Sequence, residues 1–435
     1  MQRVKIKSWL AVHTAVCILL SFFINTACST PTNEQTTPRK TVTVFEGARL
    51  IMGDGSVPIE NAAFVVEDTH LTQVGSIDDI EIPDNSIAIR VDLTGRTVMP
   101  AIIDTHTHLG DTREALIEDL QRKAYYGVGV SMSLGHDSGE LSFQIREELI
   151  HNAARYRTAG RGITAPEPGR SEIPYWITKP EEGRQAVQEL AIQNVDLVKI
   201  WVDDRNGMYD KLTPELYGAV IDEAHQQGLR VTAHIEYLED AKGLLRAGVD
   251  AFAHGIRDKD IDDELVALFK EHPNVVLVPN LNNRGVASDL SWLSETIMPE
   301  ELQQFQDAAI DRPEAQQRFA IQARNLARLS TEGIKIGFGT DGNAGWTPHV
   351  EMADMVATGM TPAQVIVAAT KNSAELLGVT DAGTLTVGNS ADFIVLEANP
   401  LDDIINTRRI VDVYLRGARV DREALSAAWT GQGLE

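Results

Sequence analysis

The stretch "MPAIIDTHTHLG" (Met99–Gly110) places two histidines, His106 and His108, one residue apart at the end of an apolar run. A short apolar run of this kind predicts a buried strand. Residues i and i+2 of a strand point to the same side, so the two imidazoles share one face. A lone histidine in a core strand is usually a hydrogen-bonded core residue, whereas a pair on one face favours a shared ligand.

Downstream of this stretch, further apolar strands alternate with helical patterns. We expect these strands at Val128–Gly135, Val195–Val202, Leu229–Ile235, Val249–Gly255, Asn274–Asn280 and Gly333–Gly342. Strands that alternate with helices form βα units around a parallel sheet. The predicted fold class is therefore α/β, with residues 101–383 forming a (β/α)8 TIM barrel.

Both ends of the chain have a different pattern from its middle. Residues 41–100 and 384–425 read as short alternating strands broken by Gly, Asp and Asn turns. Within each of these ranges no long helix separates the strands. They predict a small β-sandwich domain built from both ends of the chain, with domain edges near Pro100 and Gly383. A length of 435 residues suits one large barrel plus such a smaller domain.

The first 28 residues read as a signal peptide. A basic start is followed by an apolar stretch from Trp9 to Ile24 and by small residues before Cys28, the order that is typical of bacterial secretory signals. The segment also resembles a lipoprotein signal, in which Cys28 is lipidated and becomes the mature N-terminus. Asn25 departs from that pattern, which prefers an aliphatic residue there, so simple cleavage to a soluble periplasmic protein stays open.

Residues 29–40 are polar and rich in Thr and Pro, and they predict a flexible tether. Ser29, directly after the cysteine, suggests sorting to the outer membrane. We therefore expect an exported protein of a Gram-negative bacterium, either free in the periplasm or attached to the outer membrane through its lipid alone. Cys17 and Cys28 are the two cysteines of the chain, so no disulfide framework is expected.

The formal net charge of -24 argues against nucleic acid as a partner, because phosphate binding needs a basic face. The acidity is explained by solubility alone. Hydrophobic residues make up 43 % of the chain, enough for a sizeable core. A small-molecule ligand is therefore the partner that we expect.

Polar side chains stand at or near the ends of the predicted barrel strands, where the catalytic groups of such barrels are built. Imidazole and carboxylate are the usual ligands of a catalytic zinc ion, whereas an ammonium group has no lone pair to give. The candidate metal-ligating residues are His106, His108, Lys199, His234, His254 and Asp341.

Lys199 interrupts an otherwise apolar run, and a buried unpaired ammonium group is costly. Two readings are open from the residues. Lys199 either forms a salt bridge to a core carboxylate, or burial and nearby metal charge lower the pKa of its amine.

The motifs "DTHTH", "VKI", "TAHI", "AHG" and "GTDG", in this order, resemble the amidohydrolase superfamily. The tail segments "TPAQVIVAATKNSAELLG" and "GNSADFIVLEANPLDDI" resemble its imidazolonepropionase-related branch, which includes bacterial prolidases and other zinc-dependent carboxypeptidases. The resemblance extends from about Thr41 to Arg422. Ala101 departs from it, since a Gly is common after the Pro.

The resemblance implies a binuclear zinc site. His106 and His108 would bind the more buried metal, and His234 and His254 the second. Lys199, carboxylated by CO2, would bridge the two ions as a carbamate. Imidazolonepropionase itself uses one metal and lacks this lysine, so its substrate is not carried over.

The resemblance also implies hydrolysis of a C–N bond, either amide or peptide, by attack of a metal-bridging hydroxide. Asp341 would contact the buried metal, take the proton of the water as general base and pass it to the leaving amine as general acid. A dipeptide or an N-acyl amino acid is the expected substrate. A lactonase or phosphotriesterase on the same site and a noncatalytic binding lipoprotein remain the alternatives.

The sequence indicates the substrate-contacting residues less clearly than the metal-ligating ones. Related prolidases use similarly placed His and Tyr groups to polarise the carbonyl, which implies roles for His136 and Tyr237; the alternative is that both are loop residues. Arg170 lies in a Pro-rich loop that reads equally as a substrate-contacting lid or as an ordinary surface loop. His349 resembles a histidine that is frequent in this branch. The family often forms homo-oligomers, but no feature here fixes their number.

Overall fold

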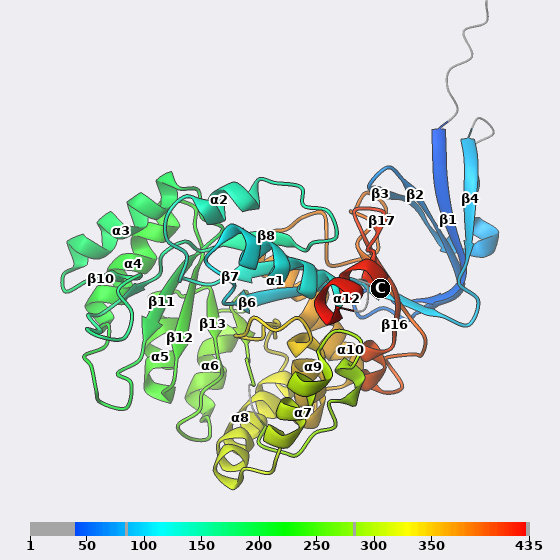
Figure 1. Ribbon diagram of the computed structural model, residues 1–435. Coiled ribbons are helices and arrows are strands. Elements are labelled where there is room, and N and C mark those ends of the chain that lie inside the picture. The colour runs from blue at the N-terminus through cyan, green and yellow to red at the C-terminus, as the bar shows by residue number, and fades with distance from the viewer. Residues whose placement is uncertain (1–39, 83–85, 282–283, 432–435) are drawn as a thin grey trace, which may run out of the picture. The chain divides into compact units, whose positions relative to one another are not determined.

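The computed structural model describes residues 40–82, 86–281 and 284–431 (Figure 1). The predicted signal peptide, the lipidation site Cys28 and the tether up to residue 39 lie outside the described residues. Within the described part of the chain, no helix is both long and apolar enough to cross a membrane.

One sheet joins the two ends of the chain. Its eight strands follow the order β17-β16-β15-β5-β1-β2-β3, with β4 paired to β1. The antiparallel pairing of β5 with β15 makes the link, with Val98 opposite Val395. The strands are β1 (Lys40–Leu50), β2 (Ile59–Glu67), β3 (His70–Ser76), β4 (Ser86–Asp92), β5 (Thr97–Pro100), β15 (Phe393–Leu396), β16 (Ile410–Leu415) and β17 (Ala418–Arg419).

Four aromatic rings form the core of this sheet. Phe45 stacks on Phe64 at 4.9 Å between ring centroids, and Phe393 stacks on Tyr414 at 4.7 Å. The rings of Phe64 on β2 and Phe393 on β15 are 5.1 Å apart. In a flat sheet, three strand spacings would separate them by about 14 Å. The sheet is therefore folded over, and its two ends face each other across the rings.

The remaining strands form two parallel sheets, one of three strands (β6-β7-β8) and one of six (β10-β9-β11-β12-β13-β14). Parallel strands that are buried on both faces read as apolar runs, as these do. The chain passes from the first sheet to β6 at Ala101. The strands are β6 (Ile102–Thr107), β7 (Val128–Ser133), β8 (Arg155–Thr158), β9 (Ile163–Thr164), β10 (Tyr175–Trp176), β11 (Val198–Val202), β12 (Val231–Ile235), β13 (Ala251–Ala253) and β14 (Val276–Val278).

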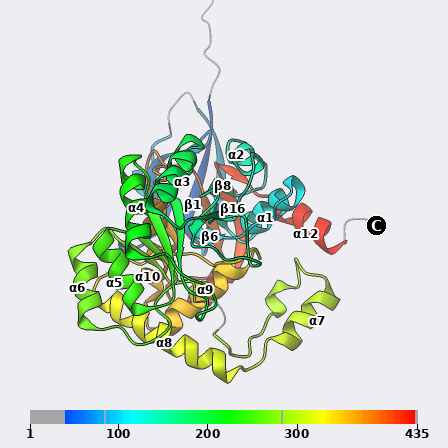
Figure 2. The ribbon, with the colours of Figure 1, turned by 90° about the vertical axis from the view of Figure 1, so that its left-hand side faces the viewer.

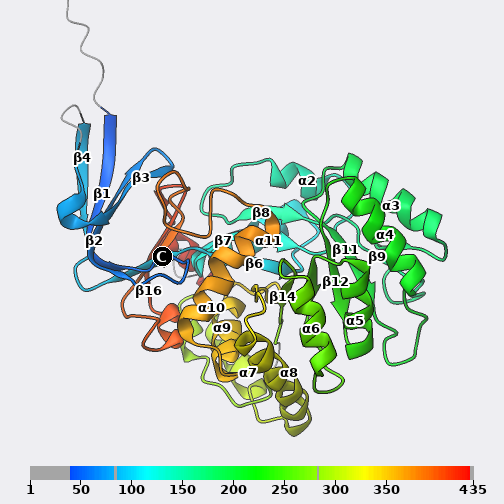
Figure 3. The same ribbon diagram turned by 180° about the vertical axis from the view of Figure 1, so that it is seen from behind.

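Helices follow these strands, so the middle of the chain is an α/β unit. Figure 3 shows α4, α5 and α6 packed in series along the outside of the larger parallel sheet. Local signals set their ends: the Thr112 side chain caps α1, and Gly248, in the left-handed region at φ 87°, ends α5. These helices are α1 (Arg113–Tyr125), α2 (Leu141–Arg146), α3 (Pro180–Ile192), α4 (Pro214–Gln226), α5 (Leu238–Ala247) and α6 (Asp263–Glu271).

The C-terminal half contributes further helices. Figure 2 shows α12 beside α1, where the Arg122 guanidinium lies 4.4 Å from the centre of the Trp429 ring. These helices are α7 (Pro299–Ala308), α8 (Pro313–Thr331), α9 (Thr347–Ala357), α10 (Pro362–Val367), α11 (Ser373–Leu377) and α12 (Arg422–Thr430). Short turns of other helix types lie at Ile77–Asp79, Ser291–Leu293, Ala368–Asn372 and Ile404–Arg408.

The predicted last strand, Gly333–Gly342, is not a regular strand; it makes one isolated parallel bridge, between Ile336 and Leu277. It nevertheless lies between β14 and β6. The Gly337 amide donates to the carbonyl of Leu277 (2.9 Å), and the Asp341 amide donates to the carbonyl of His106 (2.7 Å). A Cβ on Gly339 would lie 2.8 Å from the Cβ of His106, so only glycine permits this approach. The segment thereby delivers Asp341 to the paired histidines.

Candidate functional site

Five histidine rings form a continuous series at the ends of the parallel strands. The ring centroids of His136 and His108 are 4.9 Å apart, those of His108 and His106 5.2 Å, and those of His106 and His254 5.1 Å. The rings of His254 and His234 follow at 4.5 Å. The structure thus brings together four strand-end histidines and His136, although they are spread over almost 150 residues of sequence.

Asp341 lies at the middle of this series. Its Oδ1 is 3.1 Å from Nε2 of His106 and 3.0 Å from Nε2 of His108, and its Oδ2 is 3.7 Å from Nε2 of His254. Ligand atoms of His106, His108 and Asp341 all lie within 4.8 Å of one another. These three residues can therefore share one metal ion.

Asn280 determines which ring nitrogen of His106 carries the proton. The sequence analysis did not identify this residue. Its Oδ1 accepts from the backbone N–H of His254 (3.2 Å) and lies 3.0 Å from Nδ1 of His106. Because Oδ1 is an acceptor, Nδ1 of His106 carries the proton, and a neutral ring then has a bare Nε2. Asn280 ends the run "NVVLVPN", so a polar residue at a strand end was the available signal.

The site therefore fits a cation. Burial lowers the pKa of His106, which favours the neutral ring, whose Nε2 lone pair faces the Asp341 carboxylate. Burial alone would raise the pKa of Asp341, but His106 and His108 hold it well below its usual value. Neutral imidazole and ionised carboxylate are the forms that bind divalent metals, and two electron-rich atoms 3.1 Å apart need a positive charge between them.

Lys199 lies on β11 with 0 % of its surface exposed, and its Nζ has no hydrogen-bond partner among the described residues. Its stem packs against Gly135, the residue before His136, and Nζ lies 5.4 Å from the centre of the Trp201 ring. Burial lowers the pKa of this amine to about 7. Of the two readings open from the sequence, this environment favours the amine with a lowered pKa.

An ion-pair network that the sequence did not indicate surrounds His234. Nε2 of His234 lies 2.9 Å from Oδ2 of Asp203 and 3.2 Å from Nη1 of Arg205. Arg205 also donates to Asp203 (2.6 Å) and to Glu167 (2.9 Å), and Glu167 accepts from Arg170 at 2.6 Å. Arg170, predicted as a substrate contact, thus lies at the outer end of this network.

The two predicted carbonyl-polarising residues differ in their placement. His136 belongs to the ring series, and burial together with the charge of His108 lowers its pKa to about 4. The Tyr237 hydroxyl donates to Oδ1 of Asp204 at 2.8 Å, and this hydrogen bond raises its pKa to about 12. Tyr237 lies three residues after His234 but is held by Asp204 rather than by a histidine.

The structure does not bring His349 to the cluster. It is fully buried in the core, where Nδ1 lies 3.0 Å from the Thr407 hydroxyl and Nε2 lies 3.0 Å from the Tyr126 carbonyl oxygen. Both ring nitrogens thus contact structural partners. Burial lowers the pKa of His349 to about 3, so the ring is neutral.

A buried ion pair joins the strand of His106 to the segment that precedes Asp341. Lys123 on α1 donates to Oδ2 of Asp104 at 2.8 Å, and both residues are 0 % exposed. Asp104 also accepts from the Thr340 amide (3.0 Å) and hydroxyl (2.8 Å), and from the His106 amide at 3.4 Å. One carboxylate therefore ties β6 to the residue that precedes Asp341.

We expect Lys123→Met to lower the free energy of unfolding by about 3 to 5 kcal/mol, because it leaves the Asp104 carboxylate buried without its cation. Urea unfolding of the two proteins measures the difference. The double variant Lys123→Met/Asp104→Asn should recover part of the loss, since the buried charge is then removed as well. A double variant no more stable than the single one would contradict this account.

Backbone strain converges on the same cluster. His254, Asn280 and Asp341 adopt positive φ angles of 87°, 46° and 54°. Side chains other than glycine rarely adopt such angles, and residues held there tend to occur at functional sites. Three of the ten described residues other than glycine that have positive φ angles thus belong to this cluster, the candidate active site.

The chain is similar to known proteins over most of its length. The model of the amidohydrolase family matches residues 178–420. Ochratoxinase of Aspergillus niger is 26 % identical over 421 residues, covering 83 % of this chain and 82 % of that protein. Imidazolonepropionase of Deinococcus radiodurans is 27 % identical over 363 residues, covering 76 % of this chain and 85 % of that protein.

Solved structures share the fold. The crystal structure of a candidate prolidase from Bifidobacterium longum has a TM-score of 0.73 and 28 % sequence identity, and the match covers 92 % of this chain and 100 % of that one.

Proposed function

The chain belongs to the amidohydrolase family and is a hydrolase that acts on carbon–nitrogen bonds, and we propose that it cleaves the amide or peptide bond of a dipeptide or an N-acyl amino acid. The observation that carries the proposal is the Asp341 carboxylate, which lies 3.0–3.1 Å from Nε2 of two histidines. The family typically uses divalent metals, and this group offers the ligand atoms for one.

We assign two zinc or similar divalent ions to the site. His106, His108 and Asp341 would hold the first, and His234 and His254 the second. When bound, such ions supply an acidified water and polarise the scissile carbonyl. The second pair supports this assignment because its rings are 4.5 Å apart and burial lowers the pKa of both, which leaves them neutral.

Lys199 would bridge the two ions as a carbamate. In that step the neutral Nζ would form a bond to the carbon of CO2, one C=O π bond would open, and one proton would pass to water, so the product carries an anionic oxygen pair. A neutral amine is required, and a pKa of about 7 supplies a substantial neutral fraction at physiological pH. Among the described residues this buried amine has no hydrogen-bond partner, which supports the proposed modification.

Asp341 would take a proton from the attacking water and transfer it to the leaving nitrogen. Only the ionised form can accept a proton, and the lowered pKa of Asp341 keeps the group in that form. His136 would orient the carbonyl, since its ring lies 4.9 Å from that of His108. Tyr237 would assist after release from Asp204, and Arg170 would act on the substrate from the network around His234.

The proposal also includes the domain architecture and the location of the protein. The two parallel sheets and the Gly333–Gly342 segment would form one closed (β/α)8 barrel over residues 101–383, and the folded-over sheet would be a β-sandwich domain. The protein would be exported, with Cys28 as its lipid anchor in the periplasm or at the outer membrane.

A hydrolysis screen tests the function. The zinc-loaded protein is assayed against dipeptides, N-acyl amino acids, lactones and a phosphotriester, before and after removal of metal with a chelator. We expect amine release from an amide substrate. Chelation should lower this activity by at least about 100-fold, because mutation of a residue that only supports a metal ligand already costs 10–100-fold. Adding zinc should restore the activity.

Other outcomes would separate the alternatives. Turnover of a lactone or a phosphotriester alone would retain the metal site and reject the amide substrate. A protein that binds no metal and hydrolyses nothing in the panel would favour the noncatalytic binding protein. Activity that survives complete metal removal would refute the metal-dependent mechanism.

A further inference from the structure

Asp203 contacts the ring of His234, one of the two histidines assigned to the second ion. It directly follows β11, and His234 lies on the neighbouring parallel strand β12, opposite Trp201. Oδ2 of Asp203 lies 2.9 Å from Nε2 of His234, and each residue is only 8 % exposed. A carboxylate oxygen and a ring nitrogen this close share either a proton or a cation, because two bare lone pairs would repel each other.

Arg205 excludes a metal ion from this contact. Its Nη1 lies 2.6 Å from Oδ2 of Asp203 and 3.2 Å from Nε2 of His234. A guanidinium group thus already supplies a positive charge beside both atoms, and it would repel a divalent ion there. Among the described residues, no third His, Cys, Asp or Glu offers a ligand atom within 4.8 Å of both groups. The contact between Asp203 and His234 therefore holds a proton.

The shared proton belongs to His234. Both oxygens of Asp203 accept from Arg205: Oδ1 from its backbone amide at 2.9 Å and Oδ2 from its Nη1 at 2.6 Å. The carboxylate thus acts as an acceptor throughout, and Nε2 of His234 is the donor. A neutral imidazole carries one proton and one lone pair, so the lone pair of His234 is left on Nδ1.

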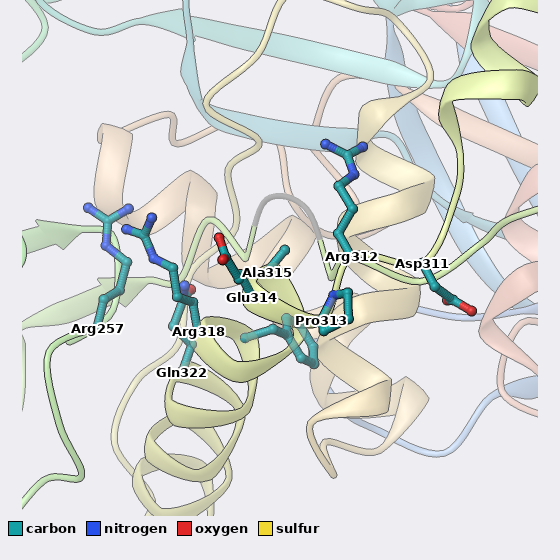
Figure 4. Close-up of a pocket in the computed structure, with 9 residues that line it drawn as sticks. Arg257, Asp311, Arg312, Pro313, Glu314, Ala315, Arg318 and Gln322 are labelled. Atoms are coloured by element: carbon teal, nitrogen blue, oxygen red, sulfur yellow. The ribbon is translucent and has the colours of Figure 1, made fainter.

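A second guanidinium group whose charge acts on His234 is engaged elsewhere. Nε of Arg257 lies 2.9 Å from Oε2 of Glu236. Figure 4 shows the guanidinium group of Arg257 beside that of Arg318, whose Nη2 lies 3.7 Å from Oε1 of the same carboxylate. Arg257 is thus paired with Glu236, and the contact at Nε2 of His234 belongs to Asp203.

Arg205 is itself held in place. Its Nε donates to Oε1 of Glu167 at 2.9 Å, and Glu167 is only 1 % exposed. The backbone of Arg205 has a φ of 53°, in a region that side chains other than glycine rarely adopt. Such strain persists where the surroundings hold it and tends to occur at functional sites. It supports a positioning role for Asp203, the carboxylate that Arg205 holds against His234.

We propose that Asp203 is a positioning residue for the second metal ion: it keeps the proton of His234 on Nε2, so that the ring presents Nδ1 to the ion. The inference rests on the two-ion site of the proposed function. The two ions would then use different ring nitrogens, since Asn280 keeps the proton of His106 on Nδ1 and leaves Nε2 for the first ion. Partners behind a metal-ligating histidine fix the orientation of its ring and which nitrogen is bare.

The position of the proton is tested on metal-free protein with ¹⁵N-labelled histidine. Spectra near neutral pH distinguish a protonated ring nitrogen from a bare one, and His234→Gln identifies the signals of His234 by their loss. We expect the proton on Nε2 in the wild type. In Asp203→Leu it should move to Nδ1, because the remaining neighbour, Nη1 of Arg205, can only donate. A wild-type ring with its proton on Nδ1 would overturn the proposal.

Competition with a chromophoric chelator measures the affinities for the first and the second zinc ion. Asp203→Leu should bind the second ion about 10- to 100-fold more weakly and the first ion as the wild type does. Asp203→Asn, which keeps an acceptor oxygen and a similar shape, should lose less. Equal weakening of both ions would show a merely structural role and reject the inference, as would an unchanged affinity for the second ion in Asp203→Leu.

Asp204→Leu is the matched control, because this neighbouring carboxylate accepts from the Tyr237 hydroxyl rather than from a histidine. It should leave the proton of His234 and both zinc affinities unchanged. A double variant tests whether Asp203 acts through His234. In the His234→Gln background, Asp203→Leu should not weaken the second ion further; a further loss would assign Asp203 a separate role and contradict the proposal.

These measurements separate failure of the inference from failure of the proposed function, because none of them needs turnover. A wild type that has the proton on Nε2 and binds two zinc ions, the second dependent on Asp203, would support the inference even if it cleaves no amide bond. A wild type that binds only one zinc ion would reject the two-ion site and the inference together.

Discussion

Asp341→Asn is expected to lower kcat for amide hydrolysis by about 10²- to 10⁴-fold, the contribution of a positioned general base and acid. The carboxylate lies 3.0–3.1 Å from Nε2 of His106 and His108. Asparagine is the least disruptive replacement because it has the same shape and tolerates the left-handed backbone of this position, φ 54°. The measurement is steady-state kinetics with the best substrate of the screen.

Asp354→Asn serves as the control for this prediction. Asp354 is also a largely buried carboxylate of the same region of the sequence, but it faces Arg284 at 3.5 Å rather than the histidines. It should retain most of the activity. If Asp341→Asn folds with the melting temperature of the wild type and keeps its activity, the assignment of proton transfer to Asp341 is wrong.

Lys199→Met is expected to lower activity by at least about 100-fold, because removal of a group that merely supports a metal ligand already costs 10- to 100-fold. The same change should leave stability equal or increased at pH 6.5, since the wild type buries an amine there without a hydrogen-bond partner among the described residues. Lys123→Met, which removes an equally buried lysine that is paired with Asp104, should destabilise the fold. Removal of Lys123 should therefore lower the free energy of unfolding, whereas removal of Lys199 should not.

The pH dependence of stability gives an independent test on the metal-free protein. Burial lowers the pKa of Lys199 from 10.5 to about 7, so between these values the unfolded chain binds more protons than the folded one. Stability then rises with pH across this window, by at most about 1.4 kcal/mol per pH unit. Urea unfolding at pH 6.5, 7.5 and 8.5 should show this rise in the wild type and its loss in Lys199→Met. If the free energy of unfolding depends on pH in the same way in both proteins, the lowered pKa of Lys199 is contradicted.

The α/β class and the position of most parallel strands follow from local pattern. β12 (Val231–Ile235) and β14 (Val276–Val278) fall inside the apolar runs that predict them. The segment Gly333–Gly342 reads as a strand but makes only an isolated bridge, and its Gly339 lies so close to His106 that a Cβ there would clash. An apolar pattern predicts that a segment is buried, but it does not predict how closely two backbones approach each other.

The partners of the substrate-contacting side chains do not follow from local sequence pattern. His136 follows a strand, so its position near the other histidines could be anticipated from the chain. The resemblance assigns His349 and Tyr237 to substrate binding; in the structure His349 contacts Thr407 in the core, and the Tyr237 hydroxyl donates to Asp204. A side chain on a helix or loop can turn to several partners, and the sequence alone does not indicate which one it meets.

The sequence by itself determined the family and the types of side chain at the strand ends. A strand places residues i and i+2 on one face, and the carboxyl ends of parallel strands meet at one edge, so His106, His108, His234 and His254 had to converge. The tertiary structure alone decided that Asn280 sets the proton of His106, that Lys123 neutralises Asp104, and that Arg257 and Arg318 share Glu236. These contacts join residues that no local periodicity relates, and they exist only because packing brings distant segments within hydrogen-bonding distance.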